Sequence, residues 1–465
     1  MTIIEALDDP ALFGPLFAAA SWLRWRVFLA ALFGLPLAGE ALALFQHHTG
    51  RHAAPSAPFR EAALVIGRRG GKSRVLALIA VFLAAFRDYR PFIAPGETPT
   101  VAIIAADRKQ ARVILRYCMG LLRAVRMLAA LIEDELAESI PLTNGVVIEI
   151  HTGSIGSPRG RTFIAVLCDE IAFWRSDESA NPDVEVIAAV RPGLASIPES
   201  MLLMASSPYA KRGVLWQTFR RYWGKDGGRV LVWRGTSLEM NPVLDPAVVE
   251  DARAEDPAAA ASEFDAEFRD DVGAFVSRDV IDALVVPGRY ELAPVAGTTY
   301  AGFVDPSGGS SDSMTLAIAH RHGERGVILD AVREMRPPFS PEAVVSEFAG
   351  TLRSYAISSV TGDRYGGEWC REPFRKVGIT YQLSEKPKSD LYRDLLPTLN
   401  SGRAELLDLP RLTAQLSQLE RRTARGGRDS IDHAPGGHDD IANAVAGALL
   451  KTAAVYQVRV LPLWI

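Results

Sequence analysis

The chain has 465 residues, of which 48% are hydrophobic and 23% are charged, and its formal net charge is −4. This composition excludes a disordered chain, and the length predicts about two to three folded domains. The near balance of charge excludes a surface coated in basic residues, so contact with a nucleic acid would have to come from a local groove. The cysteines, Cys118, Cys168 and Cys370, form no C-x-x-C pair, which argues against a disulfide framework or a zinc site and favours a reducing cytoplasm.

The first part of the chain is apolar between residues 11 and 45. Arg24, Arg26 and Glu40 interrupt this stretch, and the residues before it are acidic rather than basic. A signal peptide needs a basic start, and a membrane span needs an uninterrupted apolar run. The stretch therefore predicts buried helices near a domain surface.

Apolar strands and helices alternate in the next part of the chain. The predicted strands are "ALVIG" (63–67), "TVAIIAA" (100–106), "GVVIEIHTG" (145–153), "TFIAVLCD" (162–169) and "SMLLMASSP" (200–208), and the clearest helices are 72–86 and 107–125. Buried strands separated by helices are typical of a mainly parallel α/β sheet.

A different pattern begins after an irregular, partly helical stretch at residues 241–294. Three strands joined by short turns (298–306, 313–321 and 325–335) are followed by a helix (341–355), a strand (357–365) and, at the end, a helix from residue 439. This order matches the ribonuclease H fold, in which the first and fourth strands lie adjacent and parallel. We predict an α/β domain at 1–275, a linker at 276–297, a mixed-sheet domain at 298–455 and a tail at 456–465.

The turn between the first predicted strand and its helix nearly fits the phosphate-binding loop, G-x-x-x-x-G-K-[ST]. Its residues are Gly67, Arg68, Arg69, Gly70, Gly71, Lys72 and Ser73, and Ile66 stands where the pattern has its first glycine. In such a loop backbone N–H groups surround a phosphate, the lysine reaches the β- and γ-phosphates, and the hydroxyl binds Mg²⁺. Read alone, the turn is equally compatible with a chance basic turn.

Two later strands end in polar residues that would complete a nucleotide site. In additional-strand ATPases the first acid at such a strand end holds Mg²⁺ through water and the second orients the attacking water. Asp169 and Glu170 occupy these positions, although isolated acids at strand ends are more often solvated. Ser206 and Ser207 end the next strand, where they would sense the γ-phosphate or form a plain Ser-Pro turn.

A second set of acids lies in the C-terminal domain. Asp305 ends its first strand and Asp363 its fourth, so the ribonuclease H order places them side by side, and Asp439 and Asp440 open the last helix. Converging carboxylates repel one another and favour bound cations. Two Mg²⁺ or Mn²⁺ ions about 3.5–4 Å apart would stabilise the attacking and leaving oxygens of phosphodiester cleavage.

Several neighbours of this set have a plainer interpretation. Asp439 is as well explained as a helix cap, and Asp312 is better explained as a turn residue than as a ligand. His433 and His438 flank the acidic pair. Because hard cations prefer oxygen, we expect these histidines to act as local hydrogen-bonding groups, with His438 only a weak candidate for function.

Together, "GRRGGKS", "LCDEIAFW", "SSPYAKRG", "DPSGG", "GDRYGGEW" and "HDDIANA" resemble, in this order, the motifs of the large terminase subunit of tailed double-stranded DNA bacteriophages. The resemblance covers nearly the whole chain. It implies an N-terminal P-loop ATPase domain of the additional-strand (ASCE) type, with a mainly parallel sheet, and a C-terminal ribonuclease H-like nuclease domain. Terminases couple ATP hydrolysis to pumping DNA through a portal into a procapsid, and they cut the concatemer.

The resemblance also implies roles for the residues of the first site. Lys72 and Ser73 would bind phosphate and Mg²⁺, Asp169 would hold Mg²⁺, and Glu170 would be the catalytic carboxylate. Arg68 matches the arginine of the family's loop that contacts the γ-phosphate. The segment around Trp22 to Phe28 is a guess for the adenine contact.

Other residues match the rest of the family's pattern. Ser206 and Ser207 match the coupling motif, and Asp305, Asp363 and Asp440 match the nuclease triad. Arg159 would serve a neighbouring subunit's site or be structural. Many family members have Asp where this chain has Asn443, so a fourth metal ligand is in doubt.

The resemblance finally implies partners and a location. These are ATP, Mg²⁺ with Mn²⁺ as a substitute in the nuclease, duplex DNA, a portal protein, a small terminase subunit, and further copies of the chain in a ring, with a monomer when free. The location would be the cytoplasm of an infected or lysogenic bacterium, with transient docking on the procapsid and no membrane. A helicase-like translocase with a non-cutting, DNA-binding second domain is the alternative, but such a domain would prefer Arg and Lys to acids at its sheet edge. A non-enzymatic capsid or scaffold component is a third possibility.

Overall fold

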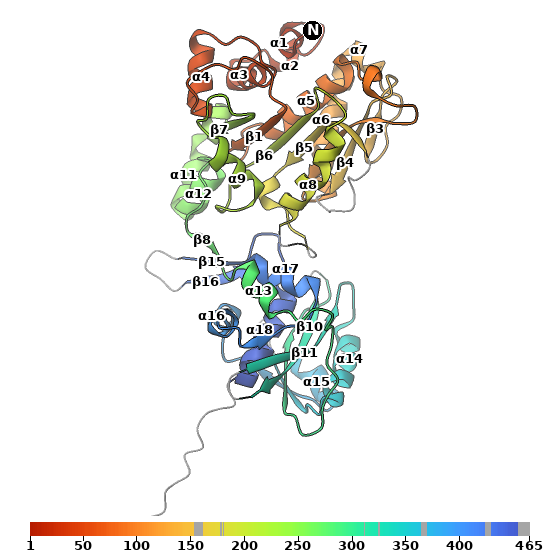
Figure 1. Cartoon of the computed structure of the whole chain (residues 1–465), viewed down its shortest axis with the longest axis vertical. Helices are drawn as coiled ribbons and strands as arrows, with labels where there is room; N and C mark the ends of the chain where they lie inside the picture. Colours follow the sequence, from red (N-terminus) through yellow and green to blue (C-terminus); the bar gives the residue numbers. More distant parts are fainter. Residues whose placement is uncertain are drawn as a thin grey trace, which may run out of the picture. The chain divides into compact units, whose positions relative to one another are not determined.

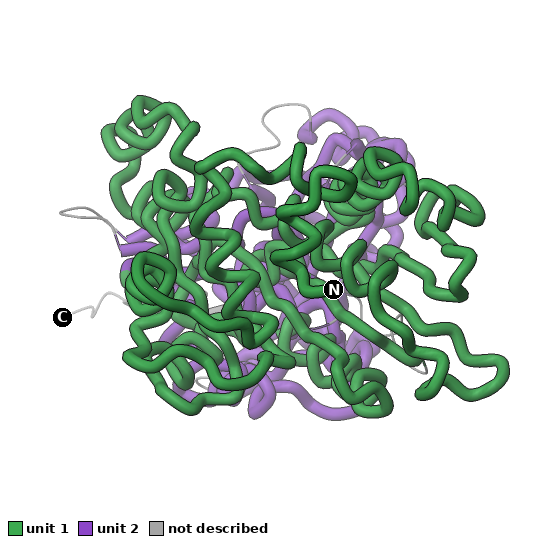
Figure 2. Tube along the Cα trace, turned by 90° about the horizontal axis from the view of Figure 1, so that it is seen from above, with its two compact units in different colours: residues 1–175, 181–270 green, residues 176–180, 271–465 purple. Residues whose placement is uncertain are grey.

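A computed structural model describes residues 1–152, 161–176, 179, 181–310, 312–323, 326–363, 370–423 and 429–453. The chain divides into two compact units (Figure 2). Unit 1 comprises residues 1–175 and 181–270, and unit 2 comprises residues 176–180 and 271–465. Arg159 and the tail at 456–465 lie outside the described residues.

Unit 1 is built on a seven-stranded sheet (Figure 1). In spatial order its strands are β3 (Ser139–Pro141), β4 (Val147–Thr152), β2 (Pro99–Ala105), β5 (Thr162–Asp169), β6 (Met201–Ser206), β1 (Glu61–Ile66) and β7 (Val230–Gly235). All neighbouring strands are parallel except β3 and β4. Strand β6 therefore lies between β1, which leads into the glycine turn, and β5, which ends in Asp169. This is the arrangement expected for an additional-strand P-loop ATPase fold.

Helices lie on both faces of this sheet, among them α5 on one face and α8 on the other. The helices of unit 1 are α1 (Ile3–Asp8), α2 (Gly14–Phe17), α3 (Leu23–Leu32), α4 (Gly39–Thr49), α5 (Lys72–Phe86), α6 (Arg108–Ala124), α7 (Arg126–Ala129), α8 (Pro182–Leu194), α9 (Gly213–Tyr222), α10 (Ser237–Met240), α11 (Pro246–Glu255) and α12 (Pro257–Glu263), with 3-10 turns η1 (Ala20–Trp22), η2 (Arg90–Phe92) and η3 (Ile171–Phe173). Because side chains alternate along a strand, Leu64 and Ile66 of β1 belong to the same core as α5, while Val65 belongs to the core on the opposite face, with Val186 of α8. The apolar strands are thus buried on both faces, as a parallel sheet requires.

The apolar N-terminal stretch forms α2 to α4, and α3 packs into the core of unit 1 through Trp25 and Phe28. Within the described parts of the chain, no helix combines the length and the apolar character needed to cross a membrane.

Unit 2 contains a six-stranded mixed sheet. In spatial order its strands are β13 (Thr380–Leu383), β12 (Ser359–Gly362), β9 (Tyr300–Asp305), β10 (Met314–His322), β11 (Gly326–Met335) and β14 (Ala404–Glu405). Strands β9, β10 and β11 form an antiparallel meander, and β12 runs parallel to β9. The predicted ribonuclease H order is therefore confirmed.

The remaining elements of unit 2 flank this sheet. A small antiparallel sheet contains β8 (Val272–Ala274), β15 (Leu419–Arg422) and β16 (Ser430–His433), and the helices are α13 (Arg278–Leu284), α14 (Pro341–Ser354), α15 (Arg371–Lys376), α16 (Lys388–Asn400), α17 (Pro410–Gln418) and α18 (Asp440–Ala453). The segment expected as a linker, 276–297, includes α13, whose Ile281 and Leu284 are buried in the core of this unit. Helix α18 lies close on β9, because a Cβ at Gly447 would come within 2.2 Å of the Phe303 ring.

Two candidate catalytic sites

The glycine turn between β1 and α5 has a tight backbone set by its neighbours. Arg69 and Gly71 have positive φ angles of 63° and 96°. The Trp25 indole N–H donates to the Gly70 carbonyl at 2.9 Å, and a Cβ at Gly67 would lie 2.4 Å from the Ser237 hydroxyl oxygen. Only glycine therefore fits at position 67, and α3 and α10 hold the turn in place.

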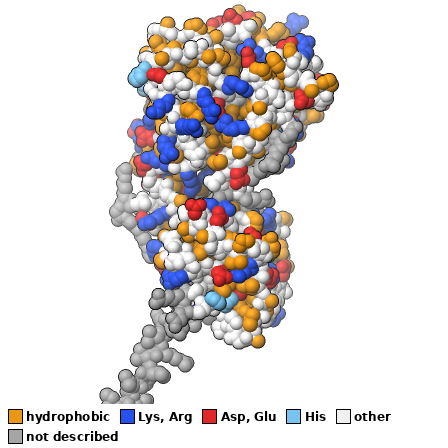
Figure 3. Space-filling view, in the orientation of Figure 1, with side chains coloured by type: hydrophobic (Ala, Val, Ile, Leu, Met, Phe, Trp, Pro, Cys, Tyr) orange, Lys and Arg blue, Asp and Glu red, His pale blue; other side chains and the backbone are white. Residues whose placement is uncertain are grey.

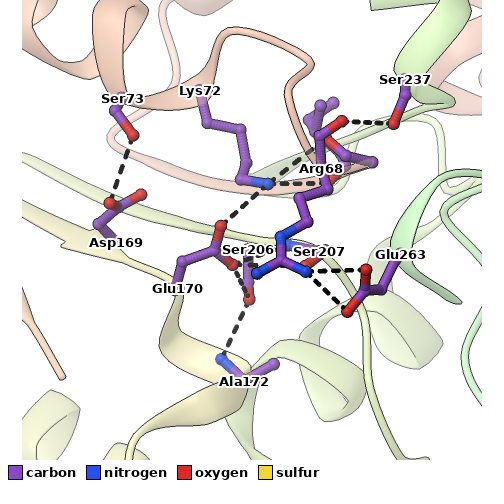
Figure 4. A network of polar contacts seen from close by, with 12 residues as sticks. Arg68, Lys72, Ser73, Asp169, Glu170, Ala172, Ser206, Ser207, Ser237 and Glu263 are labelled. Atoms are coloured by element: carbon purple, nitrogen blue, oxygen red, sulfur yellow. Dashed lines mark hydrogen bonds and ion pairs between the residues drawn. The ribbon is translucent and has the colours of Figure 1, made fainter. Parts of the chain in front are cut away.

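Lys72 and Glu170 face each other across the site (Figure 4). Lys72 Nζ donates to the Ile66 carbonyl at 3.0 Å and lies 3.2 Å from Glu170 Oε1. The other carboxylate oxygen, Oε2, accepts hydrogen bonds from the Ser206 hydroxyl at 3.0 Å and the Ser207 backbone N–H at 3.1 Å. The two serines predicted to sense a phosphate thus hold the predicted catalytic carboxylate, which links them to the lysine.

Asp169 and Ser73 lie together beside this pair (Figure 4). The Ser73 hydroxyl donates to Asp169 Oδ2 at 3.4 Å, while Oδ1 is buried and has no hydrogen-bond partner among the described residues. Burial and the neighbouring charge of Glu170 raise the pKa of Asp169 above its usual value. A cation at this position would satisfy the buried oxygen and stabilise the ionised carboxylate. Ser73 and Asp169 therefore fit the oxygen ligands that Mg²⁺ prefers.

Arg68 lies at the tip of the turn and binds α12. Its Nη1 donates to both carboxylate oxygens of Glu263 at 3.0 and 2.9 Å, and its carbonyl accepts from the Ser237 hydroxyl at 2.6 Å. Asn241 Nδ2 donates to the Arg69 carbonyl at 2.9 Å. The role of Arg68 at the γ-phosphate stays a prediction, and it would require this guanidinium to leave Glu263.

A cavity of about 990 Å³ opens beside the turn. Its lining includes Trp22, Trp25, Lys72, Tyr117 and Asn241. Its size is at the upper end of the range for small-molecule pockets. Trp22 and Trp25 line this cavity, which agrees with the guess that the Trp22 to Phe28 segment contacts the nucleotide base. The contact itself stays a prediction.

The second site lies where β9, β12 and α18 meet. Asp305 ends β9, Asp363 follows β12, and Asp440 begins α18. Burial and the charges of Asp440 and Asp363 raise the pKa of Asp305 well above its usual value, and burial raises the pKa of Asp440 to about 6. The fold therefore places Asp440 and Asp363 close enough to Asp305 for their charges to disfavour its ionised form.

Asn443 lies one turn further along α18 and contacts the same group. Its Nδ2 donates to Asp363 Oδ2 at 2.9 Å, and its Oδ1 is buried without a hydrogen-bond partner among the described residues. Buried polar atoms are normally paired. An acidic group of this kind, with a neighbouring unpaired oxygen, fits the all-oxygen environment of Mg²⁺ or Mn²⁺.

Asp439 binds Lys388 and Tyr392. Lys388 Nζ lies 3.0 Å from Asp439 Oδ2 and 2.8 Å from Asp432 Oδ1, and the Tyr392 hydroxyl donates to Asp439 Oδ2 at 2.9 Å. The role of Asp439 as a metal ligand stays a prediction. It would require this carboxylate to give up its contact with Lys388 or Tyr392.

The remaining candidates of the second site lie at its edge. Asp312 is an exposed bend residue whose Oδ1 lies 3.5 Å from His438 Nδ1, and His433 Nδ1 is 2.9 Å from the Ala434 carbonyl. His433 and His438 thus take part in local polar contacts, as predicted.

Replacing Lys388 with Met is expected to lower the free energy of unfolding by about 1–3 kcal/mol, because the buried carboxylate of Asp439 loses the Lys388 ammonium as a hydrogen-bond donor. The measurement is thermal unfolding of the full chain. Lys386→Met is the matched control: its partner Asp394 is solvent-accessible, and exposed pairs contribute less than about 1 kcal/mol. Equal effects of the two changes would contradict a structural role specific to Lys388.

The partners of both sites were missed by sequence reasoning. Ser237 and Glu263 lie far along the chain from Arg68, and no local pattern connects them. Lys388 carried one usable signal: it is the first residue of α16, where the helix dipole disfavours a positive charge. A lysine in that position is more easily explained when a carboxylate lies opposite.

The fold and the two groups of side chains define a class: an additional-strand P-loop ATPase fold joined to a ribonuclease H-like fold. No protein-family model and no curated protein sequence matches the chain.

Solved structures of large terminases are similar to it. The large terminase of bacteriophage HK97 has 15% identity and a TM-score of 0.38, over 84% of this chain and 91% of that chain. A large terminase from a thermophilic bacteriophage in complex with ATP-gamma-S has 12% identity and a TM-score of 0.38, over 92% and 98%. The magnesium-bound large terminase nuclease of the thermophilic phage G20c has 17% identity and a TM-score of 0.33, over 38% and 97%. At this identity and these TM-scores the likeness assigns no chemistry to this chain, so function has to come from the two sites.

Proposed function

We propose that the chain is the large subunit of a bacteriophage terminase, a motor that hydrolyses ATP to move duplex DNA into a procapsid and cleaves concatemeric DNA. The observation that carries the proposal is the presence of both sites in one chain. A lysine, a hydroxyl and two acids lie together in unit 1, and in unit 2 the charges of Asp440 and Asp363 raise the pKa of Asp305. The order of the sequence motifs supports the same family.

In unit 1 each residue would have a separate role in phosphoryl transfer. The Lys72 ammonium would leave the Ile66 carbonyl and Glu170 to bind the β- and γ-phosphates. Glu170, freed from Lys72, would orient the attacking water and accept its proton. Ser73 and Asp169 would hold Mg²⁺, which supplies charge neutralisation for the phosphates.

In unit 2 Asp305, Asp363 and Asp440 would hold divalent cations, Mg²⁺ or Mn²⁺. Such ions supply stabilisation of charge on the attacking and leaving oxygens of the phosphodiester. The chain's own contribution is rigidity, because β9, β12 and the start of α18 each fix one carboxylate. The partners that follow from this proposal are duplex DNA, a portal protein, a small terminase subunit and further copies of the chain in a ring, in the cytoplasm of an infected bacterium.

Purified full-length protein tests this proposal when it is incubated with linear duplex DNA. We expect Mg²⁺-dependent phosphate release from ATP, and DNA cleavage that requires Mg²⁺ or Mn²⁺ but no ATP. EDTA should stop both reactions. ATP hydrolysis with DNA left intact under every metal condition would instead support the helicase-like translocase, and absence of both activities would contradict the proposal.

A further inference from the structure

A group of three side chains with metal-binding atoms lies in unit 1 outside the nucleotide site. His47 and His48 lie in the last turn of helix α4, and Glu239 belongs to α10. Each offers one ligand atom, and the three atoms lie within 4.8 Å of one another. The two imidazole rings have centroids 4.7 Å apart, and His47 Nε2 lies 2.8 Å from Glu239 Oε1. The cysteine count could not reveal such a site, because it contains no thiol.

His48 presents a nitrogen lone pair with no partner. Its Nδ1 lies 2.7 Å from the Arg234 carbonyl oxygen, which can only accept, so Nδ1 carries the proton and Nε2 is the free base. Nε2 is buried and has no hydrogen-bond partner among the described residues, and the side chain is only 1% exposed. Burial also lowers the pKa of His48 to about 4, so the ring is neutral at physiological pH. A ring N–H held by a backbone carbonyl is the usual support of a metal-ligating histidine.

Glu239 is oriented by its own backbone contacts. Its Oε2 accepts the Thr236 N–H at 2.8 Å as part of a capping box at the start of α10. This leaves Oε1 directed to His47. Two of the three ligand residues are therefore held in place by the protein, and His47, the more exposed one, can adjust.

We propose that His47, His48 and Glu239 bind a single divalent transition-metal ion of the Zn²⁺ class. Two imidazole nitrogens and one carboxylate form a known three-ligand zinc set that leaves a fourth position for water. Mg²⁺ does not suit these residues, because it prefers oxygen ligands in octahedral geometry.

The ion would connect helix α4 to the segment that holds the phosphate loop. That segment contacts the loop through Ser237, whose hydroxyl donates to the Arg68 carbonyl at 2.6 Å, and through the Gly235 carbonyl, which accepts the Gly67 N–H at 3.0 Å. Fixing Glu239 to α4 therefore steadies the base of the loop. The site is distinct from the ATPase and nuclease groups, so its test does not depend on either activity.

The competing explanation needs no ion. In it His47 and Glu239 form a surface ion pair, and His48 is a packing residue stacked on Trp233, with ring centroids 4.8 Å apart. This explanation leaves Nε2 of His48 unpaired, which is costly for a buried polar atom.

Cobalt titration of the full chain separates the two explanations. The protein would carry Asp305→Asn and Asp363→Asn to weaken the carboxylate site, and would be treated with EDTA and dialysed. We expect one equivalent of Co²⁺ to bind with the intense visible absorption of a four-coordinate site containing nitrogen ligands, and Zn²⁺ to displace it. His47→Gln should weaken binding at least about tenfold, with the melting temperature in EDTA unchanged because this side chain is exposed. His52→Gln, at a nearby exposed histidine, is the matched control and should bind normally.

Three outcomes would overturn the proposal. One is the absence of stoichiometric Co²⁺ binding, and another is full affinity in His47→Gln. The third is loss of the absorption band in His433→Gln instead of His47→Gln, because His433 belongs to the other histidine-containing group, with Asp432 and Asp439. We expect that group to bind weakly, since Lys388 already pairs with both aspartates.

Discussion

Replacing Glu170 with Gln is expected to reduce ATP hydrolysis by about 10²–10⁴-fold while nucleotide binding is retained. The amide has nearly the same shape, but it cannot accept a proton from water. It also cannot reproduce all the present contacts: its oxygen can accept from Ser206 and Ser207, but its NH₂ group would then face the Lys72 ammonium, which is itself a donor. Phosphate release and binding of a fluorescent ATP analogue are the two measurements.

A matched control and the nuclease reaction make this test specific. Glu97→Gln changes an exposed glutamate that accepts a turn N–H from Ala94, so it should leave hydrolysis unchanged. DNA cleavage should persist in Glu170→Gln, since the carboxylates proposed for cleavage belong to unit 2. Hydrolysis within twofold of the wild type would contradict the assignment of Glu170 as the catalytic carboxylate.

The mainly parallel α/β character of unit 1 and the adjacent, parallel β9 and β12 of unit 2 were predictable from the sequence because both folds leave strong local signals. Uninterrupted apolar strands such as "FIAVLCD" indicate burial on both faces, and helices between them indicate parallel pairing. The three successive strands joined by short turns after residue 298 indicate antiparallel pairing. The segment at 276–297 was harder, because helix α13 has only seven residues and its Ile281 and Leu284 become buried only in the tertiary fold.

The chemical groups of the two sites were predictable where a residue ends an element. Asp169 and Asp305 both follow an apolar strand, and strand order then decides which acids meet. The contacts that hold these groups were not predictable, because they join residues distant in sequence. Glu263 reaches Arg68, and Lys388 reaches Asp439, only after helices pack on the sheets.

The same physical problem appears in both units. Acidic side chains are drawn into partly buried positions, where their ionised form is disfavoured. In unit 1 a lysine already lies beside the acids, since Lys72 Nζ is 3.2 Å from Glu170. In unit 2 the Asn443 amide donates to Asp363, and the charges of Asp440 and Asp363 raise the pKa of Asp305. We therefore expect the stability of unit 2 to increase when divalent cations are added.

Replacing Asp305 with Asn is expected to reduce the rate of DNA cleavage by at least about a hundredfold and, at the same time, to stabilise the metal-free protein. The amide removes one negative charge from a group in which Asp440 and Asp363 already raise the pKa of Asp305. ATP hydrolysis should be unaffected. Asp394→Asn, which changes an aspartate paired with Lys386 elsewhere in unit 2, is the control for both measurements.

The direction of this stability change follows from the pH dependence of the free energy of unfolding in EDTA. The folded-state pKa of Asp440 is about 6 and that of Asp305 is also raised, whereas an unfolded aspartate titrates near about 3.9. The folded state therefore binds more protons than the unfolded state between these pH values. The contribution of these two carboxylates to the free energy of unfolding is greatest below about pH 4 and is lost as the pH rises through about 6. Asp305→Asn should flatten this fall, and added Mg²⁺ should restore stability at pH 8 in the wild type more than in the variant. A variant that is less stable than the wild type at pH 8 in EDTA would show that Asp305 is not under repulsion, and the three-carboxylate cation site would have to be abandoned.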